Sequence, residues 1–131
     1  MKLVVDASAV IEVVLSRPKA PQFLDLIEAA DQALAPELLV CEVVNAVWKY
    51  HQFENLSLND CDRALEFGFS LVDSLVSCAE LYGEAFLLAR TLRRSAYDMF
   101  YLALARREDA AILTLDASLR KEAVKQGIRI I

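Results

Sequence analysis

Two short apolar segments of this chain end in the same way, and they constrain its fold more than any other feature. Residues 2–6 read KLVVD and residues 111–116 read AILTLD, and each aspartate is followed by Ala-Ser and a helical pattern. Segments this short and this apolar are typical of parallel strands that are buried on both faces. The chain therefore contains strands that lead into helices at Asp6 and at Asp116.

The rest of the chain alternates helical patterns with short strand-like segments. Helices are expected over residues 9–15, 22–30, 37–53, 58–67, 79–94, 96–107 and 117–126, and strands over 2–6, 33–35, 71–76, 111–115 and 128–131. This alternation predicts an α/β fold with a mainly parallel sheet flanked by helices. In such folds, sites form outside the carboxyl ends of the strands. Asp6 and Asp116 both stand at such ends.

The expected helix over residues 37–53 is apolar nearly all round. At 100° per residue, Glu42, Asn45, Lys49 and Gln52 fall on one narrow polar stripe, and apolar side chains cover most of the remainder. We therefore expect this helix to be buried on most sides and to show one polar edge.

Length and composition predict one domain over residues 1–131, because no linker, low-complexity tract or repeat divides the chain. Asp6 and Glu12 interrupt the apolar N-terminal stretch, and no segment reaches the roughly 18 apolar residues of a membrane span. The expected protein is cytoplasmic, without a membrane. Cys41, Cys61 and Cys78 are spaced too widely for a zinc knuckle or a redox pair and are expected to be buried and reduced.

The formal net charge of −5 argues against a high-affinity, non-specific DNA binder, which needs many Lys and Arg on phosphates. It does not exclude a nucleic-acid substrate, because bound divalent cations reverse the local field. The only histidine, His51, is expected to be structural, which excludes a two-histidine ribonuclease and disfavours a zinc hydrolase. No nucleophile elbow, phosphate-binding loop or dinucleotide fingerprint is present.

Four acidic residues are the candidate site, although each also has a structural explanation. Asp6 and Asp116 can cap the helices that follow them. Asp98 completes a capping-box pattern with Ser95, and Glu42 can be the solvent edge of its helix near Lys49. If all four converge, however, their repulsion calls for a divalent cation.

Oxygen ligands with no His or Cys nearby favour Mg²⁺ or Mn²⁺ over zinc. The chemistry that follows is attack of a metal-activated water on a phosphodiester.

Four segments, taken in order, resemble the PIN-domain nucleases and within them the VapC-type toxins of prokaryotic toxin–antitoxin pairs. They are LVVDASAVIE at residues 3–12, PELLVCEVVNAVWK at 36–49, SAYDMFYLALARRED at 95–109 and AILTLDASLRKEA at 111–123. The resemblance implies a parallel sheet of about five strands, Mg²⁺ or Mn²⁺, endonucleolytic cleavage of RNA, a homodimer and a small protein antitoxin that occludes the groove.

The resemblance also implies roles for individual residues. Asp6, Glu42, Asp98 and Asp116 match the family's acids, with Asp6, Asp98 and Asp116 as metal ligands and Glu42 as a ligand or a water-orienting base. Ser8 and Thr114 match supporting hydroxyls, and Asn45 either orients Glu42 or merely shares its polar edge. The basic residues that either track RNA or form a solvated surface are Arg93, Arg94, Arg106, Arg107, Arg120 and Lys121.

Two other classes of protein remain as alternatives. A strand-Asp phosphotransferase of the haloacid-dehalogenase kind needs a second Asp two residues after the first, where this chain has Ser8. A non-catalytic, receiver-like or PIN-like partner-binding module is the second alternative. A receiver would show an extra acidic pair at the first strand and a Lys where Asp116 stands, and an inactive PIN relative would have lost an acid.

Overall fold

The two apolar segments that precede Asp6 and Asp116 form strands that lie side by side in the computed structural model, which describes residues 1–131. The sheet has four parallel strands in the order β3-β2-β1-β4, and seven helices surround it. The strands are β1 (Lys2–Val5), β2 (Gln32–Pro36), β3 (Ser74–Val76) and β4 (Ala111–Leu113). The helices are α1 (Ala7–Val14), α2 (Ala20–Ala29), α3 (Leu38–Glu54), α4 (Leu58–Ser70), α5 (Cys78–Leu92), α6 (Ala96–Glu108) and α7 (Ala117–Lys125). The predicted α/β class is therefore confirmed.

The register of the sheet places the ends of β1 and β4 together. Val4 pairs with Ile112 and Val5 with Leu113, so Asp6 and Thr114 follow the strands at the same edge of the sheet. The backbone N–H of Asp6 donates to the carbonyl of Leu113 at 3.3 Å, which continues the pairing one step further. Because β2 lies on the other side of β1, Asp6 follows a central strand.

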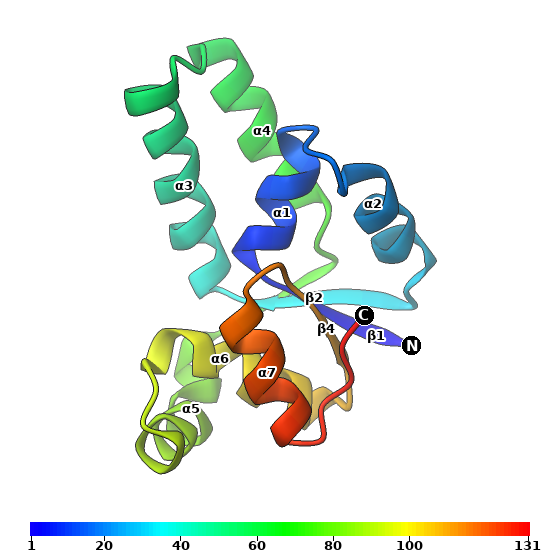
Figure 1. The fold of residues 1–131 in the computed structure, drawn as a ribbon, viewed down its shortest axis with the longest axis vertical. Coiled ribbons are helices and arrows are strands. Elements are labelled where there is room, and N and C mark those ends of the chain that lie inside the picture. Colours follow the sequence, from blue (N-terminus) through cyan, green and yellow to red (C-terminus); the bar gives the residue numbers. More distant parts are fainter.

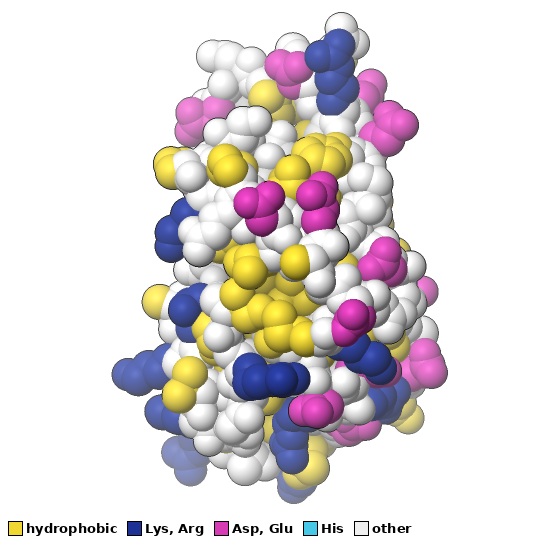
Figure 2. All heavy atoms as spheres, turned by 90° about the vertical axis from the view of Figure 1, so that its right-hand side faces the viewer, with side chains coloured by type: hydrophobic (Ala, Val, Ile, Leu, Met, Phe, Trp, Pro, Cys, Tyr) yellow, Lys and Arg dark blue, Asp and Glu magenta, His cyan; other side chains and the backbone are white.

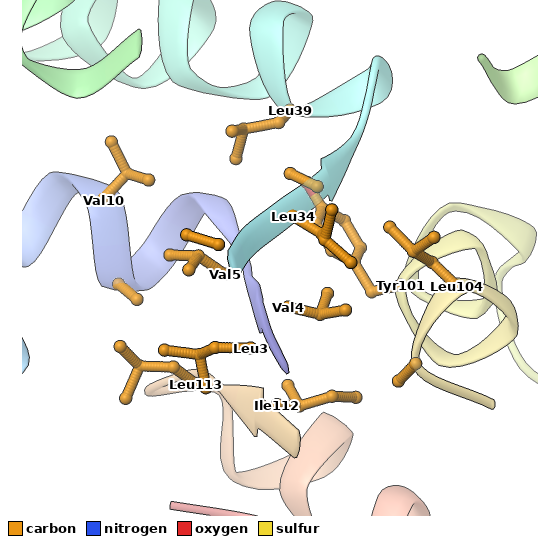
Figure 3. Close-up of a cluster of buried hydrophobic side chains, with 14 of the residues drawn as sticks. Leu3, Val4, Val5, Val10, Leu34, Leu39, Tyr101, Leu104, Ile112 and Leu113 are labelled. Atoms are coloured by element: carbon orange, nitrogen blue, oxygen red, sulfur yellow. The ribbon is translucent and has the colours of Figure 1, made fainter. Parts of the chain in front are cut away.

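Helices cover both sides of the sheet (Figure 1). Helices α1, α3 and α4 lie above it in that view, and α5 and α6 lie below it, with α7 in front. Figure 3 shows β1 between α1 and α6, with Val4 and Val5 on the central strand and Tyr101 and Leu104 pointing inward from α6. Tyr101 is 2% exposed although it carries a hydroxyl, so its polar end needs a partner. That partner lies in the candidate site.

One close approach brings α4 against α1. A Cβ added at Gly68 would lie 3.0 Å from Cγ1 of Val10, which is tighter than ordinary packing. Glycine therefore lets the two helices meet closely above the sheet.

The predicted fifth strand, residues 128–131, is wrong. This segment runs beside β4 but forms only one bridge, between Ile130 and Ile112. The physical reason is that β4 ends at Leu113. The next two residues turn toward the site, where the hydroxyl of Thr114 bonds to Asp6 and the N–H of Leu115 donates to Ser8. Thr114 and the residues after it are therefore not available to extend the pairing with residues 128–131.

The prediction that α3 is buried on most sides is also wrong. Only Leu39, Val43 and Val47 are buried, whereas Trp48 is 50% exposed and Phe53 is 70% exposed. The helix has apolar residues on its outer face, but no other element covers them. Cys41 on this helix is exposed and Cys78 is half-buried, so the expectation of buried thiols holds only for Cys61, while all three cysteines are free.

His51 has the structural role expected of it. Its Nδ1 lies 2.6 Å from the carbonyl of Leu56, just beyond the C-terminal end of α3.

None of the helices combines the length and apolar character needed to cross a membrane.

Candidate active site

Asp6 is the most enclosed of the four predicted acids. It is 6% exposed and caps α1, with its Oδ1 accepting from the backbone N–H of Ala9 at 3.0 Å. The same oxygen accepts from Ser8 Oγ at 2.6 Å, and Oδ2 accepts from the hydroxyl of Thr114. A buried carboxylate is tolerable only when it is hydrogen-bonded in this way. Asp6 therefore caps α1, as the structural explanation expected, and its carboxylate is also held in a fixed position at the edge of the sheet.

Ser8 and Thr114 join the two strand ends around Asp6. Their hydroxyl oxygens lie 3.3 Å apart. Ser8 Oγ also accepts from the N–H of Leu115 at 2.9 Å, and Thr114 Oγ1 accepts from the N–H of Asp116 at 3.0 Å. Thr114 is completely buried. The two hydroxyls therefore fix the β4–α7 turn against the start of α1.

Asp116 begins α7 in the same way that Asp6 begins α1. Its Oδ1 accepts from the N–H groups of Ser118 at 2.9 Å and Leu119 at 3.2 Å, and its Oδ2 accepts no hydrogen bond. The residue is half-buried. One oxygen of Asp116 is therefore used by the cap, while the other is available to a ligand.

Glu42 and Asp98 reach the same region from helices on opposite sides of the sheet. Glu42 lies on α3 and is half-buried, and its Oε1 accepts from the hydroxyl of Tyr101 at 2.5 Å. Asp98 lies in the first turn of α6 and accepts no hydrogen bond from the protein. The predicted capping box does not form, because the Ser95 side chain makes no cap hydrogen bond. The structural explanation for Asp98 is therefore absent.

Tyr101 is a site residue that the sequence argument missed. It lies three residues after Asp98 on α6, so both side chains project from one helix face. That spacing was the available signal, since a buried Tyr one turn from a candidate acid needs a partner for its hydroxyl. Its partner is Glu42, and Tyr101 thereby connects α6 to α3.

The acids affect one another electrostatically. Burial raises the pKa of Asp6, and the nearby charge of Asp116 raises it further against the lowering effect of the three hydrogen bonds. Burial likewise raises the pKa of Glu42, with added repulsion from Asp98 and Asp6. The pKa of Asp98 is raised by burial and by Asp116, and lowered by the guanidinium of Arg94. All four predicted acids thus lie within one shared field, and Tyr101 has its own pKa raised by burial and by Glu42.

The four acids repel one another electrostatically, but they do not form a preformed metal site. No three Asp, Glu, His or Cys side chains lie close enough together to hold an ion between them. Asn45, also predicted as a supporting residue, is exposed and does not hydrogen-bond to Glu42. The structure therefore brings the acids to one edge of the sheet and leaves Asn45 outside their hydrogen-bond network.

The donor set itself suits a hard divalent cation. Oδ2 of Asp116, Oε2 of Glu42 and both carboxylate oxygens of Asp98 accept no protein hydrogen bond. Carboxylate oxygens without protein partners are ligands that Mg²⁺ and Mn²⁺ accept, and a cation relieves the repulsion that raises the pKa values. The residues present therefore fit such an ion chemically.

The basic residues that the sequence analysis named differ in how many contacts they make within the protein. Arg94 donates to Ser118 and lies 3.8 Å from Glu122, and Arg120 donates to the carbonyls of Thr114 and Ile131. Arg107 is paired with Glu84 at 2.7 Å. The side chains of Arg93, Arg106 and Lys121 are exposed. Arg107 and Arg120 are also exposed, but the side chains of Arg93, Arg106 and Lys121 form no hydrogen bond or ion pair within the protein.

Comparison with known proteins places this geometry among a set of related chains. The PIN domain family model matches residues 3–125. Ribonuclease VapC3 of Pyrobaculum aerophilum is 32% identical over 124 residues, which cover 93% of this chain and 95% of that protein. The crystal structure of PAE2754, also from Pyrobaculum aerophilum, superposes with a TM-score of 0.75 at 21% identity, covering 99% of this chain and 83% of the other. A toxin–antitoxin complex from Klebsiella pneumoniae superposes with a TM-score of 0.62 at 18% identity, covering 86% and 84%.

Proposed function

Because this chain belongs to the PIN-domain family, we propose that it is a divalent-metal-dependent endoribonuclease and the toxin of a VapBC-type toxin–antitoxin pair. The observation that carries the proposal is the shared field of Asp6, Glu42, Asp98 and Asp116 at one edge of the sheet. The name of the relative Ribonuclease VapC3 supports RNA as the substrate class.

Mg²⁺ or Mn²⁺ is the proposed cofactor. Asp6, Asp98 and Asp116 would hold it, with Glu42 as a further ligand or as the group that orients the attacking water. When bound, the ion lowers the pKa of that water and offsets the charge that develops on the phosphate. The free carboxylate oxygens of the site support this assignment, and they suit Mg²⁺ and Mn²⁺ equally.

The chain's own residues would act by holding the acids in place. Ser8 and Thr114 donate to Asp6 and fix the direction of its carboxylate, and Tyr101 does the same for Glu42. Residues that orient ligands in this way commonly matter about 10–100-fold for metal affinity or activity. Burial and repulsion from Asp98 and Asp6 raise the pKa of Glu42, and this direction favours a role in accepting a proton from water.

The charge distribution supports RNA as a substrate despite the negative net charge. Residues 86–131 contain nine Lys or Arg and five Asp or Glu, whereas residues 1–85 contain five and fourteen. Figure 2 shows the resulting separation on one face, with Lys and Arg mainly in the lower half, the side of α5, α6 and α7. Helix α6 carries Asp98 and α7 begins at Asp116, so both acids belong to this basic part of the chain, and positive charge there is suited to holding the phosphates of RNA.

The remaining parts of the proposal concern assembly and context. We propose that residues 1–131 act as one nuclease domain in the cytoplasm, as a homodimer, and that a small protein antitoxin blocks the site. The toxin–antitoxin complex of the same fold supports the last point. Exposed apolar side chains on α5, such as Tyr82 and Phe86, support an interface between copies.

Digestion of RNA by the purified chain tests the proposal. We expect cleavage in Mg²⁺ or Mn²⁺, none in EDTA, and none with Asp98→Asn, which removes one charge with little change of shape. The melting temperature of the variant serves as the control for folding. If the wild-type chain neither cuts RNA nor binds either ion, the alternative of a non-catalytic partner-binding module is favoured instead.

A further inference from the structure

A pocket of about 320 Å³ opens beside the acidic site, and the proposed mechanism does not use it. It lies between α1 and α3 and is closed at one end by the turn that follows β4. Most of its lining is apolar, including Ala7, Ile11 and Leu115, and its polar groups come from Ser8, Glu12, Arg17 and Tyr50. Pockets that combine an apolar lining with a few placed polar groups are typical of small-ligand and cofactor sites.

The pocket is continuous with the acidic site along two helices. On α3, Glu42, Ala46 and Tyr50 are spaced four residues apart, so they line one face, and Ala46 and Tyr50 border the pocket. On α1, Ser8 donates to Asp6 and also lines the pocket. A molecule with one part at the acids can therefore place a neighbouring part in the pocket.

Arg17 is held at the pocket by a buried acid. Glu12 is 6% exposed, its Oε2 accepts from the N–H of Lys19 at 2.8 Å, and its Oε1 lies 3.5 Å from Nε of Arg17. Nη1 of Arg17 donates to the hydroxyl of Tyr50, and the guanidinium lies 5.7 Å from the centre of that ring. The side chain of Arg17 is still 46% exposed, so its remaining N–H groups can meet a ligand.

We propose that this pocket binds the nucleobase next to the phosphate that is cleaved, with Tyr50 and Arg17 as its recognition residues; this inference rests on the proposed ribonuclease function. Unstacked RNA bases are bound by stacking on aromatic rings or guanidinium planes and by hydrogen bonds to their edges. Tyr50 and Arg17 supply both kinds of surface, and Arg17 donates only, so it selects a base edge that carries acceptors.

The position of the pocket favours a base over a phosphate. Its floor is apolar, and the carboxylate of Glu12 partly neutralises the charge of Arg17. The positive charge suited to phosphates lies instead in residues 86–131. We therefore expect the RNA backbone to follow the α5–α7 side, while the base enters between α1 and α3.

A short RNA with a single cleavage site, and the same RNA lacking the base next to that site, test the pocket together with variants of Tyr50. Tyr50→Ala should raise KM for the intact RNA by about tenfold, as loss of one stacked base does, and Tyr50→Phe should restore most of it. Removing the base should weaken wild-type cleavage similarly but should have little further effect on Tyr50→Ala, because both changes remove one interaction. Phe53→Ala, an exposed aromatic residue near the end of α3, is the matched control.

Arg17→Gln tests selection of the base edge. Cleavage of a random-sequence RNA pool should keep its other preferences but lose discrimination at the nucleotide next to the cut. Arg63→Gln, on α4, should leave the pattern unchanged. Melting temperatures identify any variant that is merely unstable. If Tyr50→Ala is unstable, Tyr50→Phe, which keeps the packing of the ring, is used to test the hydroxyl alone.

The outcomes separate this inference from the function on which it rests. If the wild type cuts RNA while Tyr50→Ala and Arg17→Gln keep its KM and its sequence preference, the pocket does not read a base. If those variants lose only the binding of a protein antitoxin, the pocket is part of the partner's site and the proposal is overturned. If the wild type cuts no RNA, the ribonuclease proposal itself fails.

Discussion

Asp6 and Asp116 occupy the same local sequence, yet the fold gives them different environments. Each follows a strand, precedes Ala-Ser and caps a helix through its Oδ1. Asp6 comes after the central strand β1, so it is buried and receives hydrogen bonds from Ser8 and Thr114 as well. Asp116 comes after the edge strand β4 and keeps one oxygen free of protein hydrogen bonds. Strand order, and not local sequence, decides which aspartate is enclosed.

The largest expected effect is on catalysis. Asp6→Asn should abolish RNA cleavage, by at least about 100-fold, because it removes the charge of the most enclosed acid, while asparagine still caps α1. Asp116→Asn should reduce cleavage by about 10–100-fold, because its carboxylate lies at the exposed rim. Initial rates in Mn²⁺ and Mg²⁺ measure both. Equal residual rates for the two variants would show that the difference in burial has no catalytic meaning.

A smaller effect is expected from removing the hydroxyl of Thr114, which hydrogen-bonds to Asp6 but not to the carboxylate of Asp116. Thr114→Val keeps the shape of a completely buried side chain but removes the donor to Oδ2 of Asp6. We expect cleavage to fall about tenfold, because Asp6 loses its fixed direction, and stability to fall by about 1–3 kcal/mol, because a buried oxygen loses its partner. Rates and urea unfolding check the two parts separately. Wild-type rates in this variant would reduce Thr114 to a packing residue.

The cap of α7 can be separated from the acidic role of Asp116. Asp116→Ala should lower the free energy of unfolding by about 1 kcal/mol, whereas Asp116→Asn should leave it nearly unchanged, because asparagine caps a helix as well as aspartate does. Both variants remove the charge, so both should lose activity alike. A loss of activity confined to Asp116→Ala would indicate that only the cap matters.

The pH dependence of stability should report the enclosure of Asp6. Its folded pKa is raised above the ordinary value of 3.8, so its contribution to stability is present below that value and is lost as pH rises through the folded pKa. In EDTA, Asp6→Asn should therefore gain melting temperature relative to the wild type as the pH rises above about 4. A difference that does not change with pH would contradict the burial argument.

The sequence was enough to predict the α/β class, because the strand–helix alternation is local. It also predicted that Asp6 directly follows a strand, which is confirmed, whereas the strand expected over 111–115 ends at Leu113, so Asp116 lies three residues beyond β4 and caps α7. It could not predict which strand is central, so it could not predict that Asp6 alone is enclosed. It missed Tyr101 because its partner, Glu42, comes from α3 on the other side of the sheet, and only the tertiary structure brings the two together.

The errors have the same origin. The apolar residues of α3 predicted burial, but burial requires a second element, and none covers Trp48 or Phe53. The C-terminal apolar residues predicted a strand, but the neighbouring strand β4 ends at Leu113 when Thr114 and Leu115 turn into the site. In both cases the residue pattern indicated which structure the segment can form, but the neighbouring elements determined whether it forms.

Whether the acidic site binds a divalent ion can be measured by titrating the metal-free protein with Mn²⁺ in a calorimeter, in two buffers of different ionisation heat. If buried, mutually repelling carboxylates hold the ion, the wild type should bind Mn²⁺ and release protons, and the Asp6→Asn, Asp98→Asn double variant should do neither. Absence of Mn²⁺ binding by the wild type, or equal binding by the folded double variant, would contradict the account.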